Sequence, residues 1–179
     1  MNVWRNNLVT GGDGARQFCI NNNIMGCGWP INYDGKSLDW ETYYRLGMER
    51  YYNIKERDNG WWPAVNAMYE RIKLNDLCWT RDNVGVYYLG RVLSDWRYEN
   101  KEANVKADIV NVRNCDWRKV GTIESIPGKI ITSFIGKTIQ RIPDETISIF
   151  SKYLYIFKLY TTSYDERNFK VTFYNGIFA

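Results

Sequence analysis

Carboxylate pairs and one Gly-Lys-Thr triplet are the parts of the sequence best suited to chemistry. Asp144-Glu145 and Asp165-Glu166 could hold a divalent metal ion for phosphodiester cleavage, but neither pair has a lysine at the distance that a nuclease motif requires. Gly136-Lys137-Thr138 resembles the end of a phosphate-binding P-loop, but that motif needs a glycine where the chain has Ile131. The sequence therefore predicts neither metal-dependent cleavage nor a nucleotide-binding loop.

The absence of histidine excludes many enzyme classes. Without His there can be no Ser-His-Asp triad, no Cys-His pair and no histidine general base. The chain has 4 cysteines and no Cys-x-x-Cys pair, which argues against a structural zinc site and against a disulfide framework. We expect buried free thiols at Cys19, Cys27, Cys78 and Cys115. We therefore predict that the chain is no enzyme and needs neither a metal ion nor a cofactor.

Short strands separated by turns must position most of the remaining side chains. Apolar and β-branched segments alternate with Gly- and Asn-rich turns, and a turn at 82–85 between two such segments is typical of a hairpin. The expected strands lie at 3–4, 18–20, 24–25, 76–81, 86–93, 107–112 and 117–123.

Helices are expected between these strands. From Ser37 the apolar residues recur at helical spacing, with Ser37 or Asp39 as N-cap, and a second helix begins near Pro63. We interpret 37–72 as a helical insertion in one domain that covers 1–142. The remaining residues form a C-terminal extension, 143–179, whose periodicity fits a helix or a strand.

Composition indicates a folded protein with an excess of aromatic residues. Its 179 residues fit one compact domain, and 45% hydrophobic with 25% charged residues is typical of globular proteins. No apolar run is long enough to cross a membrane, and no signal peptide is visible, so we expect a soluble, cytoplasmic protein without a membrane partner. A net charge of +4 permits contact with a polyanion without requiring it. The 8 Trp, 14 Tyr and 7 Phe exceed what a core of this size needs, so we expect some of them on a recognition surface, whereas any single tryptophan taken alone fits an aromatic-rich β core better.

Several short motifs, taken in order, resemble the EVE-like domains of the PUA superfamily. The opening Val3-Trp4-Arg5, the glycine-rich turn at 11–14 and the segment Ile24-Met-Gly-Cys-Gly-Trp29 look like the start of such a domain. Later segments follow the order seen in the domains that precede the catalytic module of type IV, modification-dependent restriction endonucleases. These later segments lie at 72–79, 85–92, 95–98, 111–117 and 126–127. The resemblance covers about residues 1–142.

The resemblance implies an α+β fold in which a small, strongly curved β barrel carries packed helices. In the related YTH, SRA and EVE domains, a pocket on the barrel holds a single nucleobase, often methylated, between aromatic rings. Turning a base out of its stack costs a few kcal/mol, and each aromatic contact returns roughly 1–3 kcal/mol. We therefore expect a reader of nucleic acid, of DNA more than RNA, that recognises a modified base in restriction or phage defence.

Carried over to matching positions, the resemblance suggests walls for such a pocket. Trp29 ends the first motif and is the first candidate, followed by Trp96 and Tyr98. Asn114 or Asp116 could recognise the edge of the base through hydrogen bonds.

Arginines near these motifs could contact phosphates or bases, because guanidinium donors suit both. The candidates are Arg5, Arg91 and Arg97. Trp79 and Trp117 lie inside expected strands and are expected in the core, whereas Trp61-Trp62 either packs the insertion on the barrel or marks a partner surface.

The chain also departs from the family pattern. Arg5-Asn6-Asn7 stands where those restriction proteins typically show Arg-x-Gly, residues 33–62 align with nothing, and no nuclease module follows. Cleavage is therefore not expected of this chain, and a separate nuclease or motor subunit is a candidate partner. Two alternatives stay open: a protein–protein interaction module of a defence system or mobile element, and an enzyme that acts on RNA or a metabolite through Asp, Glu and Tyr.

Overall fold

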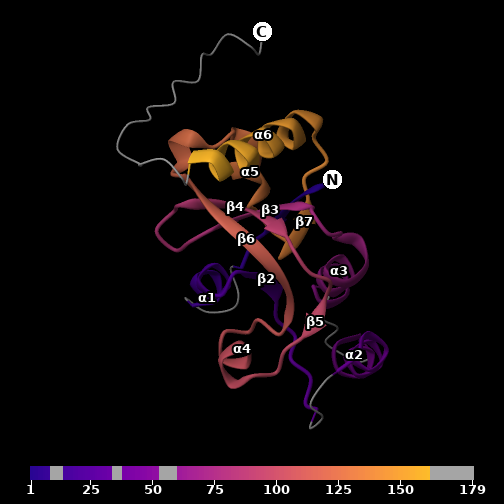
Figure 1. Ribbon diagram of the computed structural model, residues 1–179. Coiled ribbons are helices and arrows are strands. Elements are labelled where there is room, and N and C mark those ends of the chain that lie inside the picture. The colour runs from indigo at the N-terminus through magenta and orange to yellow at the C-terminus, as the bar shows by residue number, and fades with distance from the viewer. Residues whose placement is uncertain (9–13, 34–37, 53–59, 162–179) are drawn as a thin grey trace.

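A strongly curled sheet organises the molecule (Figure 1). The computed structural model describes residues 1–8, 14–33, 38–52 and 60–161. Along the sheet the strand order is β2-β6-β4-β3-β1-β7, with β5 paired to β6, and β1 runs parallel to β3 while the other pairs are antiparallel. The strands are β1 (Val3–Asn6), β2 (Ile24–Cys27), β3 (Leu77–Arg81), β4 (Tyr87–Val92), β5 (Arg97–Tyr98), β6 (Asn111–Gly121) and β7 (Ile139–Arg141).

Strand β6 produces the curl because it belongs to both halves of the sheet. Its first residues, Asn111 to Asn114, pair with β2, and its later residues, from Cys115 to Gly121, pair with β4. The sheet is thus a half-barrel, and the prediction of an α+β fold with a curved sheet is confirmed at that level. The expected strands at 107–112 and 117–123 are wrong as two elements, since 111–121 is one continuous strand and Asp108 before it adopts a positive φ of 52°.

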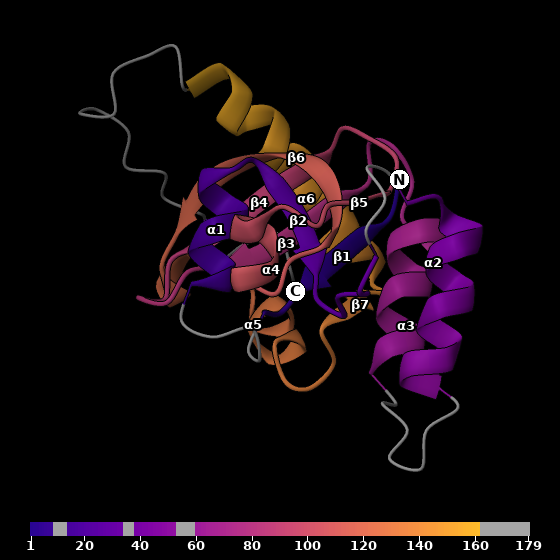
Figure 2. The same ribbon diagram turned by 90° about the horizontal axis from the view of Figure 1, so that it is seen from below.

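Helices cover the two ends of this half-barrel. In Figure 1, α5 and α6 lie at one end of the sheet and α4 at the other, and Figure 2 shows α2 and α3 side by side next to β7. The α-helices are α1 (Ala15–Asn21), α2 (Trp40–Gly47), α3 (Trp61–Asn66), α4 (Glu102–Lys106), α5 (Gly128–Ser133) and α6 (Glu145–Thr161). Shorter helical turns are η1 (Met48–Tyr52) after α2, η2 (Ala67–Arg71) after α3, and η3 (Ile123–Ser125).

The helix boundaries confirm two predictions and correct one. Asp39 is the N-cap of α2, where its carboxylate accepts a 2.8 Å hydrogen bond from the main-chain N–H of Thr42. Pro63 lies in the first turn of α3, a position that needs no N–H partner. The strand expected at 18–20 is wrong: this segment is helical because Ala15 and Cys19, one turn apart, bury the same face of α1.

The core beneath α5 and α6 contains Trp79, as expected. Trp79 is fully buried, stacks on Phe150 at 6.4 Å between ring centroids, and donates a 2.9 Å hydrogen bond to the Ser151 hydroxyl. Trp117 is half-buried and donates to the carbonyl of Ile24. Residues 129–142, an apolar stretch in the sequence, contain most of α5 and the whole of β7.

The burial of the cysteines tests one prediction, whereas several other predictions fall on residues outside the described part of the chain. All four cysteines are buried and free, as expected. In the part of the chain that the structure describes, no helix combines the length and apolar character that a bilayer span requires. The turn residues 11–13, the N-cap candidate Ser37, Asp165-Glu166 and residues 162–179 lie outside the described residues. The domain boundary at 142 stays a prediction.

Candidate functional site

Five aromatic side chains meet at the end of the half-barrel nearest α2, and we call them the aromatic cluster. The rings of Trp40 and Tyr69 are stacked at 3.9 Å with 2° between their planes, and Trp96 meets both edge-on, at 5.3 and 5.8 Å. Tyr43 links Trp96, at 5.7 Å, to Tyr98, at 5.3 Å. Trp40, Trp96 and Tyr98 are half-buried and Tyr69 is 38% exposed, so the cluster is open to solvent on part of its surface.

Helix geometry explains how these residues converge. Trp40 and Tyr43 are three positions apart on α2, so they share one helix face once Asp39 has fixed the first turn. Tyr69 comes from η2 at the end of the neighbouring helix, and Tyr98 from the short strand β5. The cluster thus joins the helical segment to the sheet.

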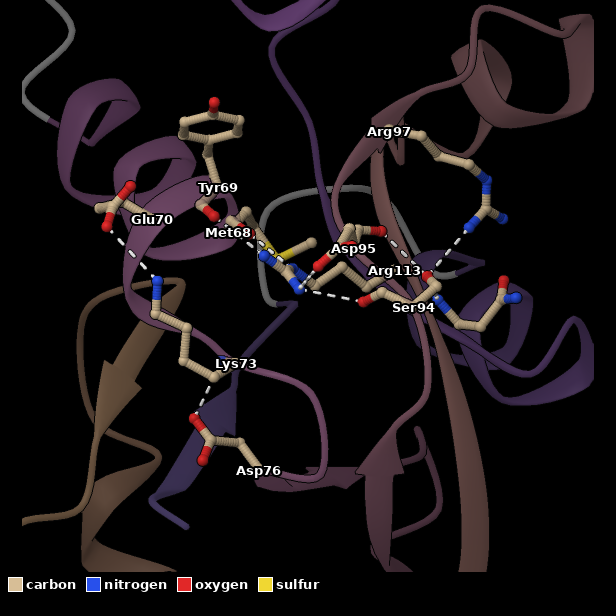
Figure 3. Close-up of polar contacts among 10 residues, drawn as sticks. Met68, Tyr69, Glu70, Lys73, Asp76, Ser94, Asp95, Arg97 and Arg113 are labelled. Carbon is tan, nitrogen blue, oxygen red and sulfur yellow. Dashed lines mark hydrogen bonds and ion pairs between the residues drawn. The ribbon is translucent and has the colours of Figure 1, made fainter.

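Arg113 on β6 fixes the position of Tyr69 (Figure 3). Its guanidinium donates hydrogen bonds of 2.6, 2.9 and 3.0 Å to the carbonyls of Met68, Tyr69 and Ser94. The first two carbonyls belong to the last turn of η2, where the helix offers them no partner. Figure 3 shows the ring of Tyr69 pointing away from this contact, and the ring stacks on Trp40. Burial lowers the pKa of Arg113, and the carboxylate of Asp95, 3.7 Å away, opposes that shift.

Asn111 is the polar centre of the cluster. Its amide donates hydrogen bonds of 2.6 Å to the carbonyl of Gly28 and 2.9 Å to the hydroxyl of Tyr43, while its oxygen accepts one of 3.0 Å from Trp96 Nε1. Asn111 is fully buried, so these three bonds satisfy its amide inside the protein. The side chain of Trp96 is therefore oriented from within β6.

Trp29, beside the cluster, has an unusual backbone conformation. Its φ is +68°, a region that bulky residues rarely occupy and that is often found at functional sites. Tyrosine hydroxyls hold this segment: Tyr43 donates to the carbonyl of Trp29, Tyr51 to that of Pro30 and Tyr98 to that of Ile31. Part of the tyrosine excess thus fixes the loop that carries Trp29.

Gly28 and Asp108 complete the support of this loop. The carboxylate of Asp108 lies where a Cβ on Gly28 would be, 2.4 Å from its ideal position, and accepts a hydrogen bond from the main-chain N–H of Trp29. Burial raises the pKa of Asp108, and that hydrogen bond partly opposes the shift. Glycine at position 28 therefore leaves the space that the Asp108 carboxylate occupies.

Replacement of Gly28 by alanine is expected to destabilise the protein by about 1–3 kcal/mol, because the added methyl group overlaps the Asp108 carboxylate. Urea denaturation measures the change in the free energy of unfolding. Gly128→Ala is the matched control, since a Cβ there meets no atom within 4 Å and Gly128 lies in helix α5. Equal stability of the two variants would contradict the packing described.

The other candidate residues occupy three separate places. The main-chain N–H of Asn114 donates to the hydroxyl of Ser94, to which Arg97 also donates, at 2.7 and 3.4 Å. These two residues thus lie near Trp96, and Arg97 also forms a 2.6 Å ion pair with Glu99.

Arg91 and Asp116 are register partners on β4 and β6, next to α6. The Arg91 guanidinium lies 5.4 Å from the ring centroid of Tyr155, and the Tyr155 hydroxyl donates a 2.6 Å hydrogen bond to Asp116. Burial and the adjacent Asp116 raise the pKa of Tyr155 to about 12. The structure therefore links these two candidates to α6 rather than to the aromatic cluster.

Arg5 is fully buried on β1, where it donates to the carbonyl of Lys137 and, at 2.7 Å, to Gln140 Oε1.

The structure brings three of the eight candidates together at Tyr43. The rings of Trp96 and Tyr98 both contact Tyr43, and the carbonyl of Trp29 accepts a hydrogen bond from its hydroxyl.

Five residues of this site are not among those predicted from the sequence: Trp40, Tyr43, Tyr69, Asn111 and Arg113. The three aromatic residues fit an ordinary helix core, so their pattern gives no functional signal. Asn111 and Arg113 do carry one, because polar side chains alternate there with Val110 and Val112 in an apolar run. Such polar positions in a strand indicate buried side chains that need specific partners.

Comparison with known proteins identifies no relative. No protein-family model, curated protein or solved structure matches the chain. Neither a fold family nor an activity is therefore transferred to it from a relative.

Proposed function

We propose that this chain binds nucleic acid as a reader, and that a single base of modified DNA stacks on the aromatic cluster. The proposal includes membership of the EVE-like group of the PUA superfamily, supported by the curled sheet and by the order of the sequence motifs. Cleavage or translocation of the bound strand would come from a separate nuclease or motor subunit.

The partly exposed stack of Trp40 and Tyr69, with Trp96 against its edge, is the observation that carries the proposal. Face-to-face contact between flat rings is how proteins hold unpaired bases, and it works for any base because each has a π face. A base that adds to the stack replaces solvent on exposed ring surface, whereas a base between the two rings requires that they separate. The strained backbone of Trp29 beside the cluster is a second supporting feature.

The cluster also provides hydrogen-bonding and cationic groups at its border. Arg97 is partly exposed near Trp96, and the charge of Arg50 is close enough to Tyr98 to oppose the rise that burial causes in the pKa of its hydroxyl. Guanidinium groups can contact phosphate oxygens or the edge of a base. An extrahelical base at the rings would therefore find polar partners beside the apolar contact.

Loss of Trp96 or Tyr69 is expected to weaken oligonucleotide binding. The alanine variants Trp96→Ala and Tyr69→Ala each remove a ring from the cluster, and a lost stacking contact corresponds to about tenfold or more in Kd. Fluorescence anisotropy with labelled single- and double-stranded DNA, plain or carrying methylated, hydroxymethylated or glucosylated bases, measures the effect at one stated salt concentration.

Tyr153→Ala is the matched control for this experiment, because Tyr153 is 68% exposed on α6, away from the cluster. The control is expected to bind as the parent does. Unchanged binding by Trp96→Ala, Tyr69→Ala and Trp29→Ala, with all three folded, would refute the assignment. RNA of the same sequence distinguishes the two nucleic acids.

A protein-binding module is the second candidate function, and helix α6 favours it. Ile149, Tyr153, Ile156 and Phe157 recur at helical spacing and are 51%, 68%, 40% and 39% exposed. A purified partner protein that binds the parent but not an Ile149→Lys, Tyr153→Lys double variant, with no oligonucleotide bound by either, would replace the nucleic-acid proposal.

A further inference from the structure

A concave surface lies where residues of α3, η2 and β7 meet, and Figure 2 shows α3 beside β7. It is an open hollow of about 340 Å³, near the lower end of the volumes that ligand sites span, roughly 300–1,000 Å³. Two prolines, Pro63 and Pro143, form part of its wall, together with Ile139 and Gln140. The hollow is separate from the aromatic cluster, whose rings do not line it.

Positive charge dominates this hollow. Arg71, Lys137 and Arg141 line it, and no lining residue in the described part of the chain is acidic. The ion pairs between described residues include none of these three cations. Three cations that converge without a carboxylate repel one another, and an anion between them relieves that repulsion.

A ring contact places the charge of Arg71, and the backbone fixes the positions from which Lys137 and Arg141 extend. The guanidinium of Arg71 lies 5.4 Å from the ring centroid of Trp4, and Trp4 is fixed by a 2.8 Å hydrogen bond from its Nε1 to the buried Asp76. Arg141 is the register partner of Trp4 across β1 and β7. Lys137 follows Gly136, whose φ of +89° makes the turn into β7. The site is thus built on paired strands and a helical turn.

Arg5 adds a buried positive charge behind the lining. Its guanidinium donates to the carbonyl of Lys137 and to the Gln140 side chain, so it contacts two of the residues that line the hollow. Its Nε is buried with no hydrogen-bond partner. Burial lowers the pKa of Arg5 to about 10, which reflects the cost of a charge without a nearby counter-ion. An anion in the hollow would lower that cost.

We infer that this hollow is a phosphate-binding site formed by Arg71, Lys137 and Arg141. Guanidinium groups bind phosphate oxygens through two parallel hydrogen bonds, and a lysine adds a mobile point charge. Gly136-Lys137-Thr138 contributes through this side chain and not as a P-loop, because it precedes a strand rather than a helix. The phosphate can belong to a free anion or to a nucleic-acid backbone. This inference does not depend on the base-binding proposal.

Calorimetric titration in phosphate-free buffer at low ionic strength tests the site with two probes, inorganic phosphate and a mixed-sequence single-stranded DNA oligonucleotide. The parent is expected to bind phosphate with one-to-one stoichiometry. Arg71→Ala, Lys137→Ala and Arg141→Ala are each expected to weaken it about tenfold. Lys152→Ala removes the same charge from an exposed position on α6 and is expected to bind as the parent does. Urea denaturation confirms that each variant is folded.

The two probes separate the sources of the phosphate. Phosphate binding that the hollow variants weaken supports a general phosphate site, and weakening for the oligonucleotide alone supports a site for the phosphodiester backbone. Phosphate binding that the hollow variants weaken, without any binding of this unmodified oligonucleotide, supports the hollow as a site for a free anion, and the anisotropy experiment with modified DNA tests base binding separately. Equal loss in Lys152→Ala, or no binding of either probe by the folded parent, would overturn the inference.

Discussion

Replacing Arg113 by methionine is expected to lower the free energy of unfolding by about 3–5 kcal/mol. Arg113 is 2% exposed, and its three donating nitrogens each satisfy a different main-chain carbonyl. Methionine fills similar space but leaves those carbonyls without partners, two of them at the end of η2. Urea denaturation monitored by circular dichroism measures the loss.

Arg113→Lys separates the hydrogen bonds of Arg113 from its charge, and Arg45→Met is the control at an exposed arginine. Arg113→Lys keeps the charge but cannot reproduce the fork of donors, so it is expected to lose much of the same stability. Arg45→Met removes an arginine from an exposed pair with Glu49 and is expected to change stability by less than about 0.5 kcal/mol. If Arg113→Met is no less stable than Arg45→Met, the role assigned to Arg113 is incorrect.

Truncation of Trp79 to alanine is expected to cost about 3–5 kcal/mol, the usual range for a fully buried aromatic side chain. The change opens a cavity beneath α6 and removes both the stack on Phe150 and the hydrogen bond to Ser151. We expect α6 to become more accessible to limited proteolysis than the sheet, which mass spectrometry of the fragments would detect.

Ser151→Ala provides the comparison for Trp79, since it removes the hydroxyl that accepts the indole N–H and leaves the ring in place. Its expected cost is about 1–3 kcal/mol, from one unsatisfied buried donor. Equal sensitivity of α6 to protease in Trp79→Ala and in the parent would show that Trp79 does not anchor the helix.

Local patterns predict the elements whose signals are contained in a few neighbouring residues. The hairpin of β3 and β4 follows from β-branched and aromatic segments around a turn, and the start of α2 follows from Asp39. Helix α1 is mistaken for a strand because three apolar residues in a row fit either structure. Strand β5 has only two residues and forms through pairing with β6, a contact that a local pattern does not contain.

The candidate site is predictable in part for the same reason. Trp96 and Tyr98 are close in the sequence and come together through Tyr43. The stack of Trp40 on Tyr69 depends on how two helices are oriented, and the contacts of Asn111 and Arg113 depend on which face of β6 meets them. These are tertiary relations, so residue types alone could not supply them.

The continuity of β6 limits how this protein can change. Alternate side chains point to opposite faces of a strand, so Asn111 and Arg113 face the helical segment while Val112 packs toward α1. Deleting or inserting one residue in the middle of β6 would reverse the facing of every side chain on one side of the change. Length variation among natural or engineered versions of this chain should therefore concentrate in its turns, such as 82–86, and spare these eleven residues.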